Sequence, residues 1–464
     1  MAGLHWMTLT GLADLIERRE VSPTEATGAA LERIAAIDPD LHAFVTVLAD
    51  RAVEAANEAE AEIALGHYRS PLHGVPIAVK DLYDIEGVPT TAGTEVLRDR
   101  PAASTCTVVE RLEGAGAVVL GKLALTEGAM AVHHPSVTPP VNPWNATRWT
   151  GVSSSGSSVA TASGLCFGSL GSDTGGSIRF PSAACGVVGL KPTWGRVSRA
   201  GVFPLAPSLD HVGPMTRSVA DAAAMLGIIA GPDPRDPTAL REAVPDYRAA
   251  LDRGVSGLRI GVDEDFAGAG MDSEVVALVL ATLDVFRDLG AEIRKVTVPD
   301  TLPSVSLWNP MCSAEAAVAH EGLFKGNEDR YGPAFRAFVE SGLALPATTY
   351  TRAHQARLQL AGELKALFED VDVLLTPTLG VETPGLDLPP DPERTALVMR
   401  FTAPFDFTGS PTISVPCGFT EDGMPASLQL VGRHLDEATL LAAGHAYEQV
   451  TSWRARRPPL ADRD

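Results

Sequence analysis

Short, uninterrupted apolar segments set the strongest limit on how this chain can fold. Residues 74–79, 117–120 and 186–190 contain no charged side chain. Such runs are typical of strands that are buried on both faces. Residues with helical spacing, as at 109–112, separate them, and strands that alternate with helices predict a largely parallel sheet covered by helices. We therefore expect an α/β fold with a central mixed, mostly parallel twisted sheet.

The 464 residues read as one large domain with four parts. Residues 1–65 are predicted to be helical, with a capping box at 22–25. Residues 66–227 are expected to form a core, 228–370 a mainly helical insertion, and 371–464 a return to the core sheet.

Composition excludes several classes of function. Asp and Glu outnumber Lys and Arg by 58 to 37, which gives a net charge of −21. A surface this acidic repels phosphate backbones and anionic lipids, so we expect neither nucleic acid nor membrane as a partner. No segment contains the ~18 uncharged apolar residues that a spanning helix needs, and residues 1–10 lack the pattern of a signal peptide. Five dispersed cysteines without a Cys-x-x-Cys pair favour a reducing, cytoplasmic location.

Histidine patterns do not indicate a metal site. His133 and His134 are adjacent but have no acidic or cysteine neighbour, and such a pair is more often solvated or packed. His320 and Glu321 begin like a zinc-protease helix, but no second histidine follows at the required spacing.

The most informative segment is residues 150–177, in which seven residues are Gly and nine are Ser. A flexible linker has this kind of composition. However, Val159, Leu165 and Phe167 provide apolar anchors that linkers lack, and Asp173 is the only charged residue in the segment. The segment is therefore predicted to be a structured part of a site.

Several known catalytic signatures do not fit. Gly121-Lys122 is followed by Leu123, where a phosphate-binding loop needs Ser or Thr. The sequence has no Gly-x-Ser-x-Gly, and none of the six lysines has a serine three residues before it. A Ser-His-Asp triad stays open, because no histidine is singled out by its context.

Residues 173–177, Asp-Thr-Gly-Gly-Ser, indicate nucleophilic catalysis. Consecutive glycines allow a tight turn and close approach of a ligand, and successive N–H groups in such a turn can form an oxyanion hole. Ser177 would then attack the polarised carbonyl with the help of a base. Lys80 is a candidate base because burial lowers a lysine pKa. Spacing alone equally allows a surface ion pair of Lys80 with Asp81 or Asp84.

The serine-rich runs at 151–157 and 171–181 resemble the amidase signature, and so do 185–193 and the segment around Lys80. The resemblance covers most of the chain and is weakest across 232–370. It implies the amidase signature fold and a Ser–cis-Ser–Lys triad. In that triad Ser177 is the nucleophile, Ser153 the bridging serine after a cis peptide bond, and Lys80 the general base.

The same resemblance implies roles for further residues. The oxyanion-hole N–H groups would come from Thr174, Gly175, Gly176 and Ser177. Side chains that support this loop would be Ser154, Asp173 and Arg179, and the substrate-binding segment would be Gly128, Ala129 and Met130. Val152 and Ser155 depart from the family, which usually has glycine at both positions, but neither change removes a catalytic atom.

The implied activity is hydrolysis of the C–N bond of small-molecule amides, aryl amides and carbamates included, without a metal or organic cofactor, by the chain alone or as a homodimer. The main alternative is the glutaminase component of a tRNA-dependent amidotransferase, which works with a partner protein. Those glutaminases usually carry an aspartate just before the segment at 401–404, where this chain has Met399 and Arg400. That difference favours a neutral, partly apolar amide, although Arg400 stays available to pair with a substrate carboxylate. A non-catalytic binding protein is the third alternative.

Overall fold

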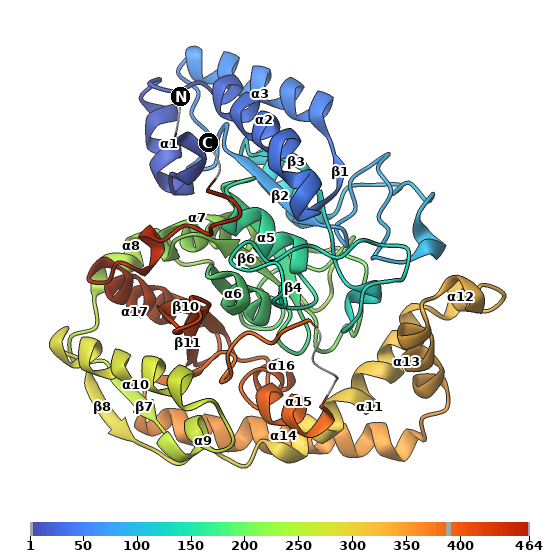
Figure 1. The fold of residues 1–464 in the computed structure, drawn as a ribbon, viewed down its shortest axis with the longest axis vertical. Helices are drawn as coiled ribbons and strands as arrows, with labels where there is room; N and C mark the ends of the chain where they lie inside the picture. The colour runs from blue at the N-terminus through green and yellow to red at the C-terminus, as the bar shows by residue number, and fades with distance from the viewer. Residues whose placement is uncertain (1–2, 387–390, 463–464) are drawn as a thin grey trace.

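A computed structural model describes residues 3–386 and 391–462 (Figure 1). The strands of these residues form one sheet in the order β1-β3-β2-β4-β6-β5-β10-β11-β9-β7-β8. The sheet therefore runs through the whole molecule, and helices flank it along its length (Figure 1). This confirms the predicted α/β domain with a central mixed sheet.

The chain builds the sheet in two halves. The first half contains β1 (Phe44–Val47), β2 (Pro76–Lys80), β3 (Val118–Leu123), β4 (Gly168–Asp173), β5 (Val188–Lys191) and β6 (His211–Thr216). The second half contains β7 (Arg259–Val262), β8 (Glu292–Lys295), β9 (Val373–Pro377), β10 (Thr412–Phe419) and β11 (Pro425–Gly432). The three apolar runs of the sequence correspond to β2, β3 and β5.

The expectation of a mostly parallel sheet is wrong in strand direction. β2 runs parallel to β3 and β4, and β7 runs parallel to β8 and β9. The other six neighbouring pairs in the described sheet are antiparallel. Every residue of β2, β3, β4 and β6 is buried whatever the direction of its neighbours. An apolar run therefore reports burial on both faces, and it does not report parallel pairing.

Helices of the first half cover the N-terminal strands. They are α1 (Leu9–Glu17), α2 (Pro23–Leu41), α3 (Ala49–Ala64), α4 (Thr107–Gly114), α5 (Ser155–Ala162), α6 (Arg179–Cys185) and α7 (Val219–Ile229). The predicted capping box is present: the Ser22 hydroxyl accepts from the Glu25 N–H, and the Glu25 carboxylate accepts from the Ser22 N–H. α5 begins directly after the serine-rich turn, so it fixes where that turn lies.

Helices of the second half form the rest of the shell. They are α8 (Tyr247–Ala250), α9 (Glu264–Gly268), α10 (Ser273–Asp288), α11 (Leu302–Ala319), α12 (Glu321–Phe324), α13 (Pro333–Leu343), α14 (Ala347–Asp370), α15 (Pro392–Met399), α16 (Ala403–Phe407) and α17 (Glu437–Gln449). α11 packs against α13 and α14 on one flank of the molecule (Figure 1).

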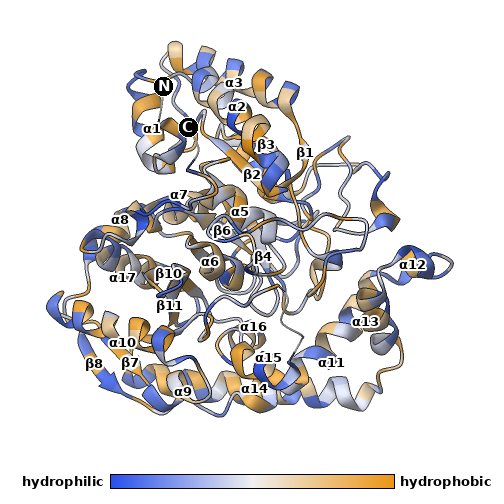
Figure 2. Ribbon diagram, in the orientation of Figure 1, coloured by the Kyte–Doolittle hydropathy of each residue, from blue (hydrophilic) through white to orange (hydrophobic). Residues whose placement is uncertain are grey.

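The main hydrophobic core lies where α1, α7, α10 and α17 pack on the sheet. Figure 2 shows hydrophobic and hydrophilic residues alternating along peripheral helices such as α3 and α10, as expected for helices that bury one face. Within residues 3–386 and 391–462, no helix is both long enough and apolar enough to cross a bilayer.

Candidate active site

Lys80 ends β2 inside the protein and is surrounded by hydroxyl groups. Its side chain is completely buried. The Nζ atom donates to the Oγ atoms of Ser153 at 2.7 Å, Ser154 at 3.0 Å and Ser172 at 2.9 Å. Three hydroxyl acceptors saturate an ammonium group without a carboxylate beside it, so the lysine has no direct counter-ion among these contacts.

Burial lowers the pKa of Lys80 to about 7, although the charges of Asp173 and Asp210 act to raise it. A lysine with its ordinary pKa is almost wholly protonated at neutral pH and cannot accept a proton. At a pKa near 7 a large fraction of the amine is neutral. The site therefore contains a group that can work as a base at physiological pH.

The surface ion pair that the sequence left open for Lys80 is wrong. Asp81 is buried, and its carboxylate pairs with Lys122 at 2.9 Å instead. The Asp81 carboxylate also accepts from the Thr91 N–H at 3.2 Å. Lys122, on β3, therefore satisfies Asp81 and leaves Lys80 to the serines.

The serine turn before α5 connects Lys80 to the position of Ser177. The peptide bond between Val152 and Ser153 is cis, as the resemblance implies. The Ser153 carbonyl accepts from the Thr126 N–H at 3.3 Å, and the Ser154 N–H donates to the Ser177 carbonyl at 3.3 Å. Ser177 is partly exposed, whereas Ser153 and Ser154 are fully buried. The arrangement places one accessible hydroxyl next to a buried base.

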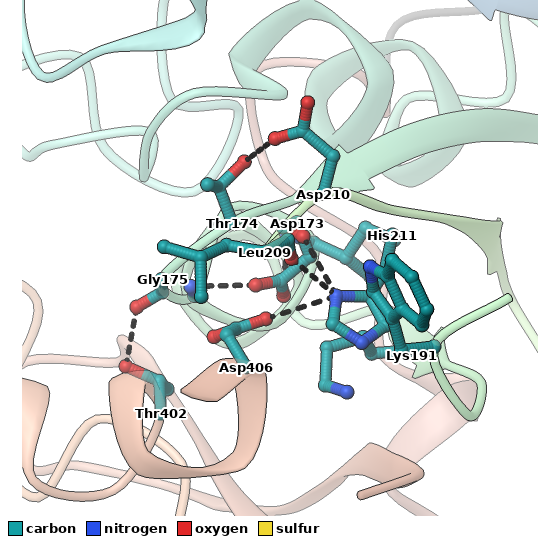
Figure 3. A network of polar contacts seen from close by, with 12 residues as sticks. Asp173, Thr174, Gly175, Lys191, Leu209, Asp210, His211, Thr402 and Asp406 are labelled. Atoms are coloured by element: carbon teal, nitrogen blue, oxygen red, sulfur yellow. Dashed lines mark hydrogen bonds and ion pairs between the residues drawn. The ribbon is translucent and has the colours of Figure 1, made fainter. Parts of the chain in front are cut away.

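The loop after β4, residues 174–177, is held by its carbonyl groups. The indole Nε1 of Trp308 donates to the Thr174 carbonyl at 2.7 Å, and the Thr402 hydroxyl donates to the Gly175 carbonyl at 2.7 Å. The Thr174 hydroxyl donates to Asp210 at 2.7 Å, as Figure 3 shows. A Cβ atom on Gly175 would lie 2.7 Å from the Trp308 ring, so only glycine fits there.

The N–H groups of this loop differ in availability. The Gly176 N–H donates to the Asp173 carboxylate at 2.6 Å. Those of Thr174, Gly175 and Ser177 have no acceptor among the residues that the structure describes. Three of the four predicted oxyanion donors are therefore free to bind an oxygen, and the fourth is engaged within the protein.

Asp173 and Arg179 lie together beneath the loop. The Asp173 carboxylate accepts from the Ile178 N–H at 3.0 Å and from Nε and Nη2 of Arg179, both at 2.9 Å. Although burial alone would raise it, the adjacent guanidinium holds the pKa of Asp173 well below its usual value. Nη1 of Arg179 continues to the Thr402 carbonyl at 3.1 Å. These contacts join the loop after β4 to the segment before α16.

Sequence reasoning missed several residues of this site. Trp308 lies on α11, Thr402 and Asp406 at α16, and Asp210 and His211 where β6 begins. None of them belongs to a local motif, and each reaches the loop only through the fold. The single available signal was the position of residues 402 and 406 in the segment that resembles the family.

The predicted substrate segment lies against the serine turn. Gly128 and Ala129 both have positive φ, 58° and 60°, and both are buried. A Cβ on Gly128 would lie 2.1 Å from the ring of Phe335. A hydrophobic cluster adjoins the segment, and it includes Leu82, Ala129, Leu205, Trp308, Phe335 and Ala403, with Met130, Phe203 and Met399 partly buried beside them. The surroundings of the segment are therefore mainly apolar.

Arg400 is not available to a substrate. It is buried, its Nη2 donates to the Phe266 carbonyl at 2.6 Å, and its guanidinium lies over the rings of Phe266 and Phe401 at 5.3 and 4.8 Å. The possibility that Arg400 pairs with a substrate carboxylate is therefore wrong in this structure.

The unusual Ser155 has a histidine partner. Its Oγ lies 3.1 Å from Nε2 of His133, and burial lowers the pKa of His133 to about 4, so the ring is neutral at physiological pH. His134 contacts Ser136 instead. Across the described residues, no group of three or more His, Cys, Asp or Glu side chains is placed to hold a metal ion.

A cavity of about 290 Å³ opens on the other side of Lys80. Its walls include Ala129, Ser172, Arg199, Asp210 and His211. It reaches Ser172, which is one of the three hydroxyl partners of the Lys80 ammonium.

Comparison with known proteins places this site in a family. The Amidase family matches residues 25–441. The chain belongs to the Amidase family. This amidase is 47% identical over 459 residues to the putative amidase AmiD of Mycobacterium tuberculosis, covering 98% of this chain and 96% of that protein. It is 41% identical over 490 residues to the glutaminase component (GatA-type) of the glutamyl-tRNA(Gln) amidotransferase of Roseiflexus sp., covering 99% of each.

Solved structures give the same result for the fold. The amidase matches a bacterial aryl acylamidase of the amidase signature family with a TM-score of 0.90 and 26% identity, over 100% of both chains. It matches a protein of a vestigial complex, linked to the origins of an s-triazine catabolic enzyme, with a TM-score of 0.90 and 32% identity, over 97% of this chain and 100% of the other. The amidase is thus an enzyme of the class that hydrolyses C–N bonds of amides.

Proposed function

We propose that this amidase cleaves neutral, partly apolar amides, aryl amides and carbamates included, through an acyl-enzyme on Ser177. One observation carries the proposal: the buried Lys80 amine donates only to serine hydroxyls, and one of these serines is bonded through its backbone to Ser177. A weak serine nucleophile needs such a base next to it.

Acylation follows from this arrangement. Neutral Lys80 accepts a proton through the Ser153 hydroxyl from Ser177 Oγ, and Ser177 attacks the substrate carbonyl carbon. The negative oxygen binds the free N–H groups of Thr174, Gly175 and Ser177, while the Gly176 N–H stays on Asp173. Ser153 and Lys80 then return the proton to the leaving nitrogen as the C–N bond breaks.

Deacylation uses the same groups in reverse. Water gives a proton through Ser153 to Lys80 and attacks the acyl carbonyl. The proton returns to Ser177 Oγ as the acid leaves. The sequence of steps uses the chain's own residues and no cofactor. Met130 and its neighbours Gly128 and Ala129 would contact the substrate beside the serine turn.

The apolar surroundings support the substrate class. A charged α-amino acid such as glutamine needs a paired cation and carboxylate in the pocket, or its desolvation is costly. Arg400 is committed to Phe266, and Met399 belongs to the apolar cluster. A neutral amide loses less hydration on entering these surroundings.

The alternative function is the glutaminase component of a tRNA-dependent amidotransferase. The 41% identity to the Roseiflexus amidotransferase chain favours it. That function requires a partner protein, whereas the amide hydrolase acts alone or as a homodimer. All five cysteines are buried free thiols, which supports a reducing, cytoplasmic location for either function.

The deciding measurement is kcat/KM of the purified chain alone for an acyl anilide and an aryl carbamate, compared with glutamine. We expect the anilide or the carbamate to exceed glutamine by more than tenfold, because of the desolvation cost of the charged amino acid. Ser177→Ala serves as the control and should be inactive on all three. A tenfold preference for glutamine would instead support the amidotransferase function.

A further inference from the structure

Two buried carboxyl groups share one guanidinium nitrogen beneath the proposed oxyanion loop. Nη2 of Arg179 contacts Asp173 Oδ1 at 2.9 Å and Asp406 Oδ2 at 2.5 Å. All three side chains are fully buried. Figure 3 shows both carboxyl groups side by side, with His211 next to them. Two negative charges this close in a buried site repel each other, so their protonation has to be examined.

The hydrogen bonds of the two carboxyl groups are very unequal. Asp173 accepts from three backbone N–H groups, those of residues 176, 178 and 179, in addition to the guanidinium. Asp406 accepts only from Arg179, and its Oδ1 has no hydrogen-bond partner among the described residues. The pair is thus built to stabilise a negative charge on Asp173 and leaves half of Asp406 unsatisfied.

His211 does not supply the missing donor. Its Nδ1 lies 2.6 Å from the Leu209 carbonyl, 3.2 Å from the Asp173 carbonyl and 3.4 Å from Asp406 Oδ1. Three oxygens around one nitrogen require the proton on Nδ1, and the shortest contact assigns that proton to Leu209. Burial keeps the pKa of His211 well below its usual value, so the ring is neutral.

The other groups around Asp406 do not change this result. Burial, together with the Asp173 charge, raises the pKa of Asp406 well above its usual value, although Arg179 and Lys191 act to lower it. The Lys191 ammonium donates to the Ser410 carbonyl at 2.6 Å. The titratable and charged groups that face Asp406 are Asp173, Arg179, Lys191, His211, Arg357 and Cys312.

We propose that the carboxyl group of Asp406 is protonated in the working enzyme and donates a hydrogen bond to Asp173, which makes Asp406 a positioning residue for the loop that carries Ser177. A proton on Oδ1 turns the unsatisfied acceptor into a donor, and the Asp173 carboxylate lies within hydrogen-bonding reach. One negative charge then faces the Arg179 guanidinium, so the charges of these three side chains sum to zero.

The consequence concerns the Gly176 N–H, which Asp173 holds at 2.6 Å. Fixing Asp173 from below fixes that peptide group, and with it the orientation of the neighbouring N–H groups. The effect on catalysis rests on the proposed function, in which those groups bind the oxyanion. The protonation of Asp406 does not rest on it, because it follows from the hydrogen bonds alone.

The test is the melting temperature of Asp406→Asn and of the native chain between pH 4 and pH 7. Asparagine keeps the shape and offers an N–H donor to Asp173, but it does not titrate. Because the folded pKa of Asp406 is raised, the native protein loses stability as pH rises above the usual value of 3.8. We therefore expect the Tm of Asp406→Asn minus that of the native protein to increase across this range.

Asp372→Asn is the matched control. Arg259 binds the Asp372 carboxylate and lowers its pKa, so the native ion pair gains stability as pH rises. The Tm of this variant minus the native value should become more negative with pH, which is the opposite slope. If Asp406→Asn shows the slope of the control, or does not fold, Asp406 is an ionised counter-ion and the proposal is overturned.

Turnover gives the second readout. Asp406→Asn should stay within about threefold of native kcat, whereas Asp406→Leu, which has no donor, should lose about 100-fold in kcat with little change in KM, the order expected for a disturbed oxyanion hole. Equal losses in both variants would contradict a donor role for Asp406. If the native chain hydrolyses no amide, the proposed function fails, and the melting experiment still decides the protonation of Asp406.

Discussion

At the scale of single residues, Lys80 shows how burial creates a base. It has no carboxylate among its hydrogen-bond partners, and desolvation lowers its pKa to about 7. Protonated Lys80 cannot accept the Ser177 proton, so kcat/KM for an anilide should fall as pH decreases below about 7. A pH–rate profile measures this acid limb.

Lys191 provides the control for that profile, because burial lowers its pKa to about 7 as well. Lys191→Met should keep the acid limb at the same pH, whatever its effect on the plateau. Disappearance of the limb in Lys191→Met would show that this second lysine titrates, and activity that stays constant down to pH 5 would contradict a lysine base altogether.

The residues that the sequence could reveal are those of local motifs. Lys80, Ser153 and Ser177 belong to segments with a recognisable pattern, and the structure brings the first two into direct contact. Trp308 and Asp406 could not be found in this way. Their relation to the loop depends on how α11 and α16 pack against it, and a tryptophan in a helix has many ordinary packing roles.

At the scale of elements, α11 acts as a brace for the loop after β4. Trp308 connects the two through its Nε1 contact with the Thr174 carbonyl. Trp308→Phe keeps an aromatic ring but leaves this buried carbonyl without its donor. We expect kcat to fall about tenfold or more, because small displacements of catalytic groups are costly, while KM changes less. Steady-state kinetics on an anilide measure both values.

Trp453→Phe is the matched control for this substitution. It removes a comparable bond, from Nε1 to the Tyr447 hydroxyl at 3.1 Å, near the C-terminus. This variant should keep native kcat. A similar decrease in both variants would mean that loss of an indole hydrogen bond affects the enzyme generally and that α11 has no special role.

Elements differ in how far the sequence predicts them. α1, α10 and α17 agree with their apolar periodicity because each buries one face. β4 was hidden, because its residues Gly168–Asp173 are mostly small and polar and belong to the Gly/Ser-rich segment. Strand direction was also hidden, since it depends on connections and partners that a run of apolar residues does not encode.

At the scale of the whole molecule, stability and catalysis reside in different regions. Phe286 on α10 is fully buried and stacks on Tyr447 of α17, with ring centroids 5.5 Å apart, well away from the serine turn in Figure 1. Phe286→Ala should lower the free energy of unfolding by about 3–5 kcal/mol, the usual cost of such a truncation. Urea unfolding followed by fluorescence measures it.

The same variant should keep native kcat/KM at 25 °C, because the folded site is unchanged. Val318→Ala, at a position that is 72% exposed, is the control for stability and should change the unfolding free energy by no more than ~0.5 kcal/mol. Full stability combined with lost activity in Phe286→Ala would show that the two regions are coupled.

The order of the strands leaves β8 at one end of the sheet, with backbone groups that no neighbouring strand among the described residues covers. A bare edge of this kind invites pairing with another chain, which is how many β-proteins begin to aggregate. Here the edge is Glu-Ile-Arg-Lys, and Arg294 and Glu292 form an ion pair with each other. A second strand that added to β8 would have to strip water from these charges, so this short strand protects the protein against self-association at high concentration.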